Sequence, residues 1–274
     1  MNKILDTLKY DLEIFKTPNL KITSKIVLLI RKYVAVLLNK REIIYLGKKF
    51  YYDGRFSPIP LQMYPKEIAF LNKYIDLKKI NNILDIGANI GQFSFTLKSF
   101  YPNINPCCFE PNKEIFSLLQ KNMSYFGNVR LFNYGIGKEG KREFYFSPSS
   151  SGLGSFYIEN VHQFGHKKDV KKIEIINIGL NDRKLKELKV PNKFDLIKID
   201  VEGAEIEVLE SLKGITCEYL FLEVSVNRKG KVDIEETKRT IRRVFNKNPI
   251  SLCFKQFSKD SPSVDYLFKL ENIN

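Results

Sequence analysis

The sequence predicts an α/β protein built on a doubly wound, mostly parallel sheet, and three observations lead to this fold class. Over most of the chain, apolar runs of strand length alternate with stretches of helical periodicity. One such run, residues 83–86, breaks into glycine-containing chain at Gly87 and Gly91 before a helical pattern begins. The run at residues 194–201 is almost continuously apolar, as expected of a central strand covered on both faces.

The length and the cysteines limit the protein class. A chain of 274 residues can bury the core of one large or two small domains. The four cysteines show no C-x-x-C spacing, which argues against a zinc site or a disulfide scaffold and fits a reducing cytoplasm. The adjacent Cys107 and Cys108 are expected on opposite faces of one strand. No signal peptide or membrane-spanning run is visible, so we expect a cytoplasmic protein.

The positive charge is concentrated near the N-terminus. The chain carries a net +14, and residues 1–50 hold eleven Lys or Arg against four Asp or Glu, half of that excess. We favour a general solubilising excess of lysine. The alternative is a region that faces phosphate, on a lipid at the inner face of the membrane or on a phosphorylated carrier.

We expect residues 1–60 to form a helical extension with a short hairpin, and residues 61–274 to form the main domain. Residues 3–16 have one apolar face, and the run 26–38 is apolar nearly all round apart from two basic residues. Such a helix is usually buried against the protein, which we favour. The alternatives are contact with a membrane interface or with a second copy in a homodimer. A hairpin is expected around Gly47.

The remaining elements follow from periodicity and turn residues. Strands are expected at residues 83–86, 106–110, 129–134, 142–146, 173–178, 194–201, 219–224, 250–254 and 264–270. Helices are expected at residues 66–75, 112–123 (started by Pro111), 205–212 and 234–246. The last two strands would close an antiparallel edge. Residues 147–154, rich in Ser and Gly, are interpreted as a loop that serves as a lid.

The first strand ends in Asp85 and the glycine-containing turn at residues 87–91. Such turns expose backbone N–H groups to a ligand at the carboxyl end of a strand. Asn89 and Gln92 occupy the second and third glycine places of the dinucleotide fingerprint, so a nicotinamide cofactor is disfavoured. An aspartate followed by G-x-N-x-G is similar instead to the first motif of class I S-adenosylmethionine (SAM) methyltransferases.

Three further strand ends are expected to meet that turn. Glu110, twenty-five residues after Asp85, is placed to accept hydrogen bonds from both ribose hydroxyls. We favour this role over the alternative, an acid at a strand end that only faces solvent. Residues 133–137 would wrap the adenine with the backbone of Gly135 and the apolar face of Ile136. Asp200 and Glu202 share one side of their strand and would hold the methionine ammonium or cap the next helix.

Three motifs together resemble the FkbM-type methyltransferases. They are Leu-Asp-Ile-Gly-Ala-Asn-Ile-Gly at residues 84–91, Phe-Glu-Pro-Asn at residues 109–112, and Leu-Ile-Lys-Ile-Asp-Val-Glu-Gly-Ala-Glu at residues 196–205. Leu-Glu-Val at residues 222–224 and Gly-Ser at residues 154–155 also fit, whereas the usual T-L-D reads Ile-Gly-Leu-Asn-Asp here. The resemblance covers residues 80–225 and implies SAM-dependent O-methylation, often of a sugar hydroxyl in a surface glycan or of a secondary metabolite.

The resemblance also implies roles for individual residues. The expected SAM contacts are Asp85, Gly87, Ala88, Asn89, Gly91, Glu110, Pro111, Asn133, Gly135, Ile136 and Asp200. Glu202 and Glu223 lie nearest to where an acceptor hydroxyl would arrive. The candidates for a base that takes the hydroxyl proton are Glu202, Glu223, His162 and His166. No third metal ligand beside Asp200 and Glu202 is evident in the sequence, so no metal is expected.

Two other functions use the same fold. A basic chain invites an RNA methyltransferase, but residues 200–203 lack the Asn/Asp-Pro-Pro-aromatic turn that base-methylating enzymes share. Acids at that point would also repel phosphate, so a nucleic-acid partner is not expected. The other alternative is a non-catalytic SAM-binding scaffold of a glycan-assembly complex. Usage rich in Lys, Asn and Ile hints at a bacterial source.

Overall fold

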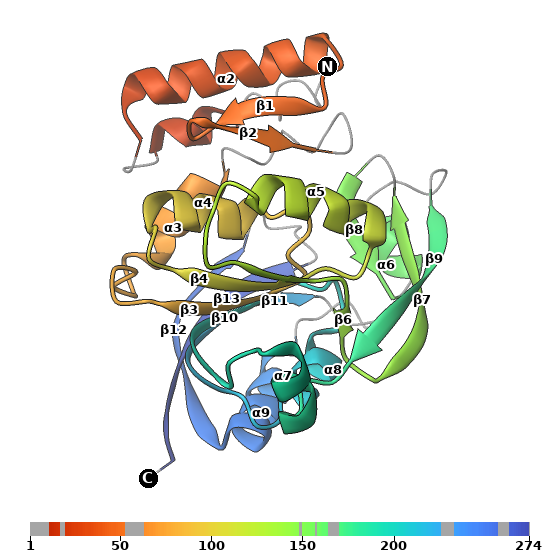
Figure 1. Ribbon diagram of the computed structural model, residues 1–274. Helices are drawn as coiled ribbons and strands as arrows, with labels where there is room; N and C mark the ends of the chain where they lie inside the picture. The colour runs from red at the N-terminus through yellow and green to blue at the C-terminus, as the bar shows by residue number, and fades with distance from the viewer. Residues whose placement is uncertain are drawn as a thin grey trace.

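A seven-stranded sheet forms the centre of the molecule in the order β12-β13-β11-β10-β3-β4-β5 (Figure 1). The computed structural model describes residues 11–16, 20–52, 63–147, 150–156, 158–163, 170–225, 233–256 and 263–273. The strands are β3 (Asn82–Ile86), β4 (Asn105–Phe109), β5 (Arg130–Phe132), β10 (Lys193–Ile199), β11 (Thr216–Ser225), β12 (Lys247–Gln256) and β13 (Ser263–Asn272). Neighbours from β11 to β5 are parallel, while β13 runs antiparallel to both β11 and β12. The expected parallel sheet with an antiparallel edge is confirmed.

Helices cover both faces of this sheet (Figure 1). One layer holds α3 (Met63–Leu71), α4 (Gln92–Phe100) and α5 (Lys113–Met123), and the other holds α7 (Asp182–Leu188), α8 (Glu205–Glu210) and α9 (Ile234–Phe245). Cys107 packs in the core cluster on one face and Cys108 in the cluster on the other, as the alternation of a strand requires. All four cysteines are free thiols.

The register between the two central strands is fixed by a side chain. Asp195 of β10 accepts hydrogen bonds from the backbone N–H groups of Asn81 and Asn82, at 2.7 and 2.9 Å from Oδ2. This contact aligns the start of β3 with β10. Their carboxyl ends then finish side by side, where the backbone N–H of Asp200 donates to the carbonyl of Ile86.

A smaller sheet lies at one end of the molecule, in the order β6-β9-β7-β8 (Figure 1). It consists of β6 (Gly135–Ile136), β7 (Gly140–Ser147), β8 (Ser150–Ser155) and β9 (Lys171–Ile178), with α6 (Ile158–Gln163) beside it. The expected lid loop at residues 147–154 is therefore wrong for most of its length, because it forms β8. Gly154 allows this strand to cross the ring of Phe144, where a Cβ would lie 2.5 Å from Cζ.

Several boundaries also differ from the expectation. The strand expected at residues 129–134 is shorter and forms β5 alone, and the next strand, β6, belongs to the other sheet. The helix expected at residues 66–75 begins earlier and ends at Leu71. Pro111 precedes α5 rather than starting it, because Asn112 caps the helix by accepting from the N–H of Glu114.

The N-terminal part contains η1 (Glu13–Lys16), α2 (Ile22–Leu37) and the hairpin β1 (Glu42–Tyr45) and β2 (Lys48–Tyr51). The hairpin was predicted, and its two turn residues, Leu46 and Gly47, have φ of 47° and 82°, the positive values that a type I′ turn needs. Of the helix expected at residues 3–16, residues 3–10 lie outside the described part of the chain. No helix among the described residues is long and apolar enough to cross a membrane.

The hairpin is anchored to the helices that cover the sheet. Asn122 of α5 accepts from the backbone N–H of Tyr51 at 2.6 Å and donates to its carbonyl at 2.9 Å. The hydroxyl of Tyr45 is 2.7 Å from that of Thr96 in α4. Tyr45 therefore shares a core cluster with α4 and α5. The division of the chain near residue 60 stays a prediction.

Helix α2 corrects the expectation that its apolar run is buried. Only Leu28 and Ala35 of that run are buried, together with Lys25 and Lys32 on the same face. The buried Asp11 is the reason, since it pairs with Lys32 and accepts from the hydroxyl of Tyr33. Apart from the half-buried Leu29, the remaining apolar side chains of α2 are exposed.

Candidate cofactor and acceptor site

A cavity of about 280 Å³ opens at the carboxyl ends of the central strands. Ligands of doubly wound sheets bind at this edge. The lining residues come from α3, the strand ends and the smaller sheet: Tyr64, Ile86, Gly87, Ala88, Asn89, Gln92, Phe93, Phe109, Glu110, Pro111, Asn112, Ile115, Tyr134, Gly135, Ile136, Phe144, Phe146, Gly154, Phe156, Lys198, Asp200, Val201, Glu202 and Glu223. Ten of the predicted site residues are among them.

The turn after β3 forms the floor of the cavity. Gly87 has a φ of 77°, and a Cβ there would lie 1.9 Å from the carbonyl oxygen of Asp200. Only glycine therefore lets the turn approach the end of β10. Asn89 has a φ of 52°, and its backbone N–H donates to Oε2 of Glu110 at 3.1 Å. The first and second motifs are thus joined by a hydrogen bond.

Glu110 is held by the backbone. Its two carboxylate oxygens accept N–H groups from Asn89 and from Asn112, the latter at 2.8 Å. Burial raises the pKa of Glu110 to about 7, against the lowering effect of these two hydrogen bonds. Each carboxylate oxygen has a second lone pair that remains for a ligand hydroxyl. The carboxylate therefore fits a ribose diol.

Three predicted cofactor residues lie outside the lining. Asn133 donates from Nδ2 to the carbonyls of Glu110 and Pro111, which fixes the end of β4. Gly91 caps α4 with a φ of 90°. Asp85 is fully buried beneath the turn, where the Ser94 hydroxyl donates to Oδ2 at 2.5 Å. Whether any of the three touches the cofactor stays a prediction.

Lys198 places a buried cation between two predicted acids. Its Nζ lies 2.9 Å from Oδ2 of Asp200, 3.8 Å from Oδ1 of Asp85 and 5.5 Å from the ring centroid of Phe93. Burial opposes the charge on Asp200, but Lys198 and a hydrogen bond with Glu223 together outweigh it and hold the pKa of Asp200 below its ordinary value. Lys198 is not among the residues predicted from the sequence. A lysine within a mainly apolar strand could have indicated that a buried acid lies beside it.

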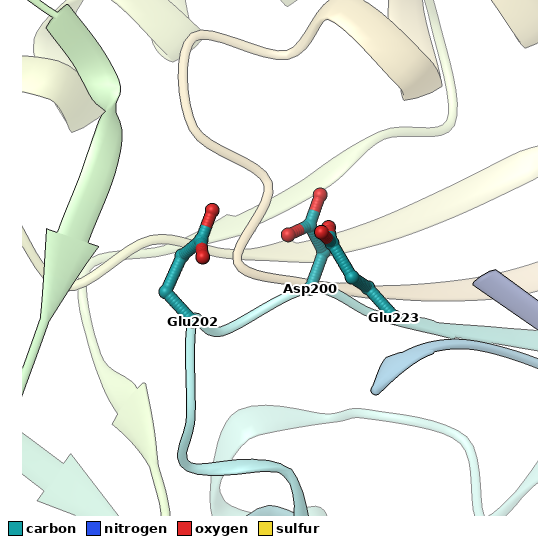
Figure 2. A group of neighbouring side chains, drawn as sticks. All are labelled: Asp200, Glu202 and Glu223. Carbon is teal, nitrogen blue, oxygen red and sulfur yellow. The ribbon is translucent and has the colours of Figure 1, made fainter. Parts of the chain in front are cut away.

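Asp200, Glu202 and Glu223 form an acidic cluster at the cavity wall (Figure 2). One carboxylate oxygen from each lies within 4.8 Å of the other two. The carboxylates of Asp200 and Glu223 are close together, and that of Glu202 stands to one side (Figure 2). Burial, and next the charge of Asp200, raise the pKa of both glutamates well above the ordinary value. Glu202 has a φ of 50°, so the backbone after β10 bends sharply at this residue.

Glu223 corrects the expectation that no third metal ligand exists. Among the described residues, the acidic cluster supplies three carboxylates at a spacing that a divalent ion accepts. Lys198 already balances one of these carboxylates. The expectation of a metal-free site stays a prediction.

The smaller sheet closes the cavity on the side of the acidic cluster. The Ser155 hydroxyl of β8 donates to the backbone carbonyl of Glu202 at 2.7 Å. Phe144 and Phe156 add aromatic walls, and their ring centroids lie 5.6 Å apart. His162 belongs to α6, but its side chain lies outside the described part of the structure, as does the whole of His166. Their candidacy as bases therefore stays a prediction.

Two further lining residues were not predicted. Tyr64 reaches the cavity from α3, which precedes the first motif. Asn112 is buried, and its Nδ2 has no hydrogen-bond partner among the described residues. Asn112 also lines the cavity beside Glu110, with this amide nitrogen buried at its wall.

The strand order and the acid at the end of β4 define a class I SAM-dependent methyltransferase. Residues 85–248 match the methyltransferase FkbM domain, which is more than half of the chain. The chain therefore belongs to the FkbM methyltransferase family, and SAM is its cofactor.

Named relatives agree with this family. The chain is 29% identical over 177 residues to "Methyltransferase 1" of Beauveria bassiana (59% of this chain, 71% of the relative). It is 26% identical over 201 residues to "Methyltransferase sdnD" of Sordaria araneosa (64% and 76%). Among solved structures, P. horikoshii TYW2 in complex with MeSAdo aligns with a TM-score of 0.49 and 13% identity, covering 89% of this chain and 83% of that one. M. jannaschii TYW2 in complex with AdoMet gives 0.48 and 14%, covering 85% and 86%.

The residues of the cavity fit SAM. Glu110 offers acceptors for the ribose hydroxyls. Gly135 and Ile136 provide an uncharged wall. The acidic cluster suits a ligand that carries a positive sulfonium and an ammonium group.

Proposed function

We propose that this protein transfers the methyl group of SAM to a hydroxyl of a carbohydrate, or of a secondary metabolite that carries neighbouring hydroxyls. The observation that carries the proposal is the acidic cluster, which shares one cavity with Glu110. Bound SAM supplies a methyl carbon activated by a positive sulfonium. The protein then needs only to orient the acceptor and to take one proton.

We assign the base to Glu202. Glu223 accepts a hydrogen bond from the Ser263 hydroxyl and shares a second with Asp200, so its carboxyl group is held in place by these two partners. The carboxylate of Glu202 stands to one side of this pair (Figure 2), in the cavity that Phe144 and Phe156 also line. As the acceptor oxygen forms its bond to carbon and the carbon–sulfur bond breaks, the hydroxyl proton passes to a Glu202 carboxylate oxygen.

The chemistry of the acidic cluster favours a polyol over a phosphate-rich acceptor. Carboxylates accept hydrogen bonds from neighbouring hydroxyls, and they repel nucleic-acid phosphate. The acceptor is a sugar that is free, nucleotide-linked, lipid-linked or part of a glycan. We place the reaction in the cytoplasm, which the four free thiols support.

The test is a screen for methyl transfer from isotopically labelled SAM to nucleotide sugars, oligosaccharides, polyols and RNA. The proposal predicts label on hydroxyl oxygen, with the regiochemistry read by mass spectrometry and NMR. Label on nitrogen or on RNA would contradict it. The same assay with EDTA, and with added Mg²⁺ or Mn²⁺, tests the metal-free expectation. Loss of turnover on chelation would reassign the acidic cluster to metal binding.

A further inference from the structure

Helix α2 has its two faces reversed relative to an ordinary surface helix. The face that packs on the hairpin includes Lys25, which donates to the carbonyl of Phe15 at 3.0 Å, and Lys32, which pairs with Asp11. An ordinary amphipathic helix turns its apolar stripe toward the core and its charges toward water. Here two of the three charges of the helix are enclosed, Arg31 being the exposed one, and apolar side chains are presented outward.

The outward face is a continuous stripe. Ile22, Ile26, Ile30, Tyr33 and Leu37 follow one another at spacings of four, four, three and four residues, which places them on one side of a helix. Their exposed fractions are 57, 44, 58, 42 and 84%. Val27 and Val34 widen the stripe and are also exposed. Single exposed apolar residues are normal, but a stripe along a whole helix indicates a partner.

The helix forms the outermost layer of the molecule. In Figure 1 it lies beyond the hairpin, on the side away from the central sheet. At 16 residues it is about 24 Å long, and no described element covers the stripe.

The charges around the stripe are almost all positive. Residues 20–52 hold eight Lys or Arg and a single acid, Glu42, which Lys49 neutralises at 2.9 Å. Lys21 is exposed at the start of α2, and Lys40 and Arg41 are exposed just after its end. The stripe is therefore bounded by cations at both ends.

We propose that the stripe docks α2 flat on an anionic lipid bilayer, with the apolar side chains in the acyl boundary and the terminal cations at the headgroups. An apolar helix face with basic flanks is the pattern of interfacial helices. Anionic headgroups complement Lys21, Lys40 and Arg41. A second copy of the chain fits less well, because a symmetric pairing of two stripes brings these like charges together.

The test is flotation of the full chain with vesicles of phosphatidylcholine, alone or with about a third phosphatidylglycerol. We expect about tenfold stronger binding to the anionic vesicles, and a decrease at high salt. Ile26→Glu combined with Ile30→Glu should weaken that binding by about tenfold or more. Both positions are exposed, so the melting temperature should not change. Ile250→Glu, at an exposed position of β12, is the matched control and should bind like the wild type.

Light scattering on the same proteins distinguishes membrane docking from pairing with a second copy of the chain. A wild type that binds neither vesicle and is monomeric would overturn the proposal. A wild-type dimer that the Ile26→Glu/Ile30→Glu variant converts to a monomer, without vesicle binding, would assign the stripe to a second copy instead. Equal binding by the wild type and this variant would also overturn it.

Discussion

Glu110 and the acidic cluster line the same cavity and differ in what surrounds their carboxylates. Glu110 is enclosed by backbone, and each of its carboxylate oxygens accepts an N–H group. In the acidic cluster, Glu202 and Glu223 face Asp200, and Lys198 is the nearest cation. Both settings raise a glutamate pKa, one mainly by burial alone and the other by burial with a neighbouring negative charge.

This difference separates binding from proton transfer. A carboxylate fixed by two N–H groups keeps its geometry and suits a neutral diol. Carboxylates that repel one another share protons, and a nearby positive sulfonium makes their ionised forms easier to reach. The same residue type therefore serves two purposes in one cavity, and each can be disturbed separately.

The largest expected effect is on turnover. Glu202→Gln removes the proton acceptor but keeps the side-chain size, so we expect kcat to fall by about 100- to 10,000-fold. SAM affinity should change little. The pH profile provides a second readout: wild-type kcat should fall as the pH drops and Glu202 becomes protonated, and the variant should lack this limb. A variant with full turnover would move the base to Glu223 or His162.

The next effect is on stability. Lys198→Met leaves the buried Asp85 and the neighbouring Asp200 without their cation, and we expect the free energy of unfolding to fall by about 3 kcal/mol. Lys184→Met, which removes the partner of the exposed Glu187, is the control and should be nearly neutral. Chemical denaturation measures both. An equal, small loss in both variants would refute the role of Lys198 between the two acids.

A smaller effect is the pH dependence of the free energy of unfolding that Glu110 contributes. In the SAM-free protein its folded pKa is about 7, against 4.5 as the ordinary value, so the folded state holds more protons between these pH values. The free energy of unfolding should therefore decrease as the pH rises from about 5 to 8, by on the order of 2 kcal/mol. Glu110→Gln lacks this contribution, and its melting temperature should depend less on pH. Parallel curves for the two proteins would contradict the raised pKa.

The smallest effect concerns the unpartnered amide of Asn112. Asn112→Ser keeps an oxygen that can cap α5 but removes the unpartnered amide donor of a residue that lines the cavity. We expect SAM affinity to fall by about three- to tenfold, with little change in melting temperature. Unchanged affinity would show that this donor does not reach the cofactor.

The central sheet could be predicted because its signals are local. The apolar run before Asp85, the spacing to Glu110 and the acids after Ile199 each announce a strand end, and their meeting follows from the topology of a parallel sheet. Lys198, and the place of the predicted Glu223 as a third carboxylate beside Asp200 and Glu202, show where this reasoning stops. Which side chains meet across different strand ends depends on register, which hydrophobic periodicity does not specify for strands buried on both faces.

Helix α2 was predicted, but which of its faces is buried could not be, for a different reason. Its apolar run reads as a buried helix, but one distant residue, Asp11, draws Lys32 to the inner face and leaves the apolar stripe outside. The β8 strand was missed because Ser and Gly have little strand propensity, while its fit against Phe144 is a tertiary contact. In both cases a contact between distant residues outweighs the local pattern.

The most direct test of the central claim is calorimetric titration of SAM into the wild type and Glu110→Ala. Losing the charge-assisted hydrogen bonds to the ribose should weaken binding by about ten- to a hundredfold. Glu174→Ala, at an exposed glutamate of β9, is the control and should bind as the wild type does. Binding by the wild type with this selective loss is the predicted result. A folded wild type that does not bind SAM, or a Glu110→Ala variant with unchanged affinity, would contradict the assignment of the cavity.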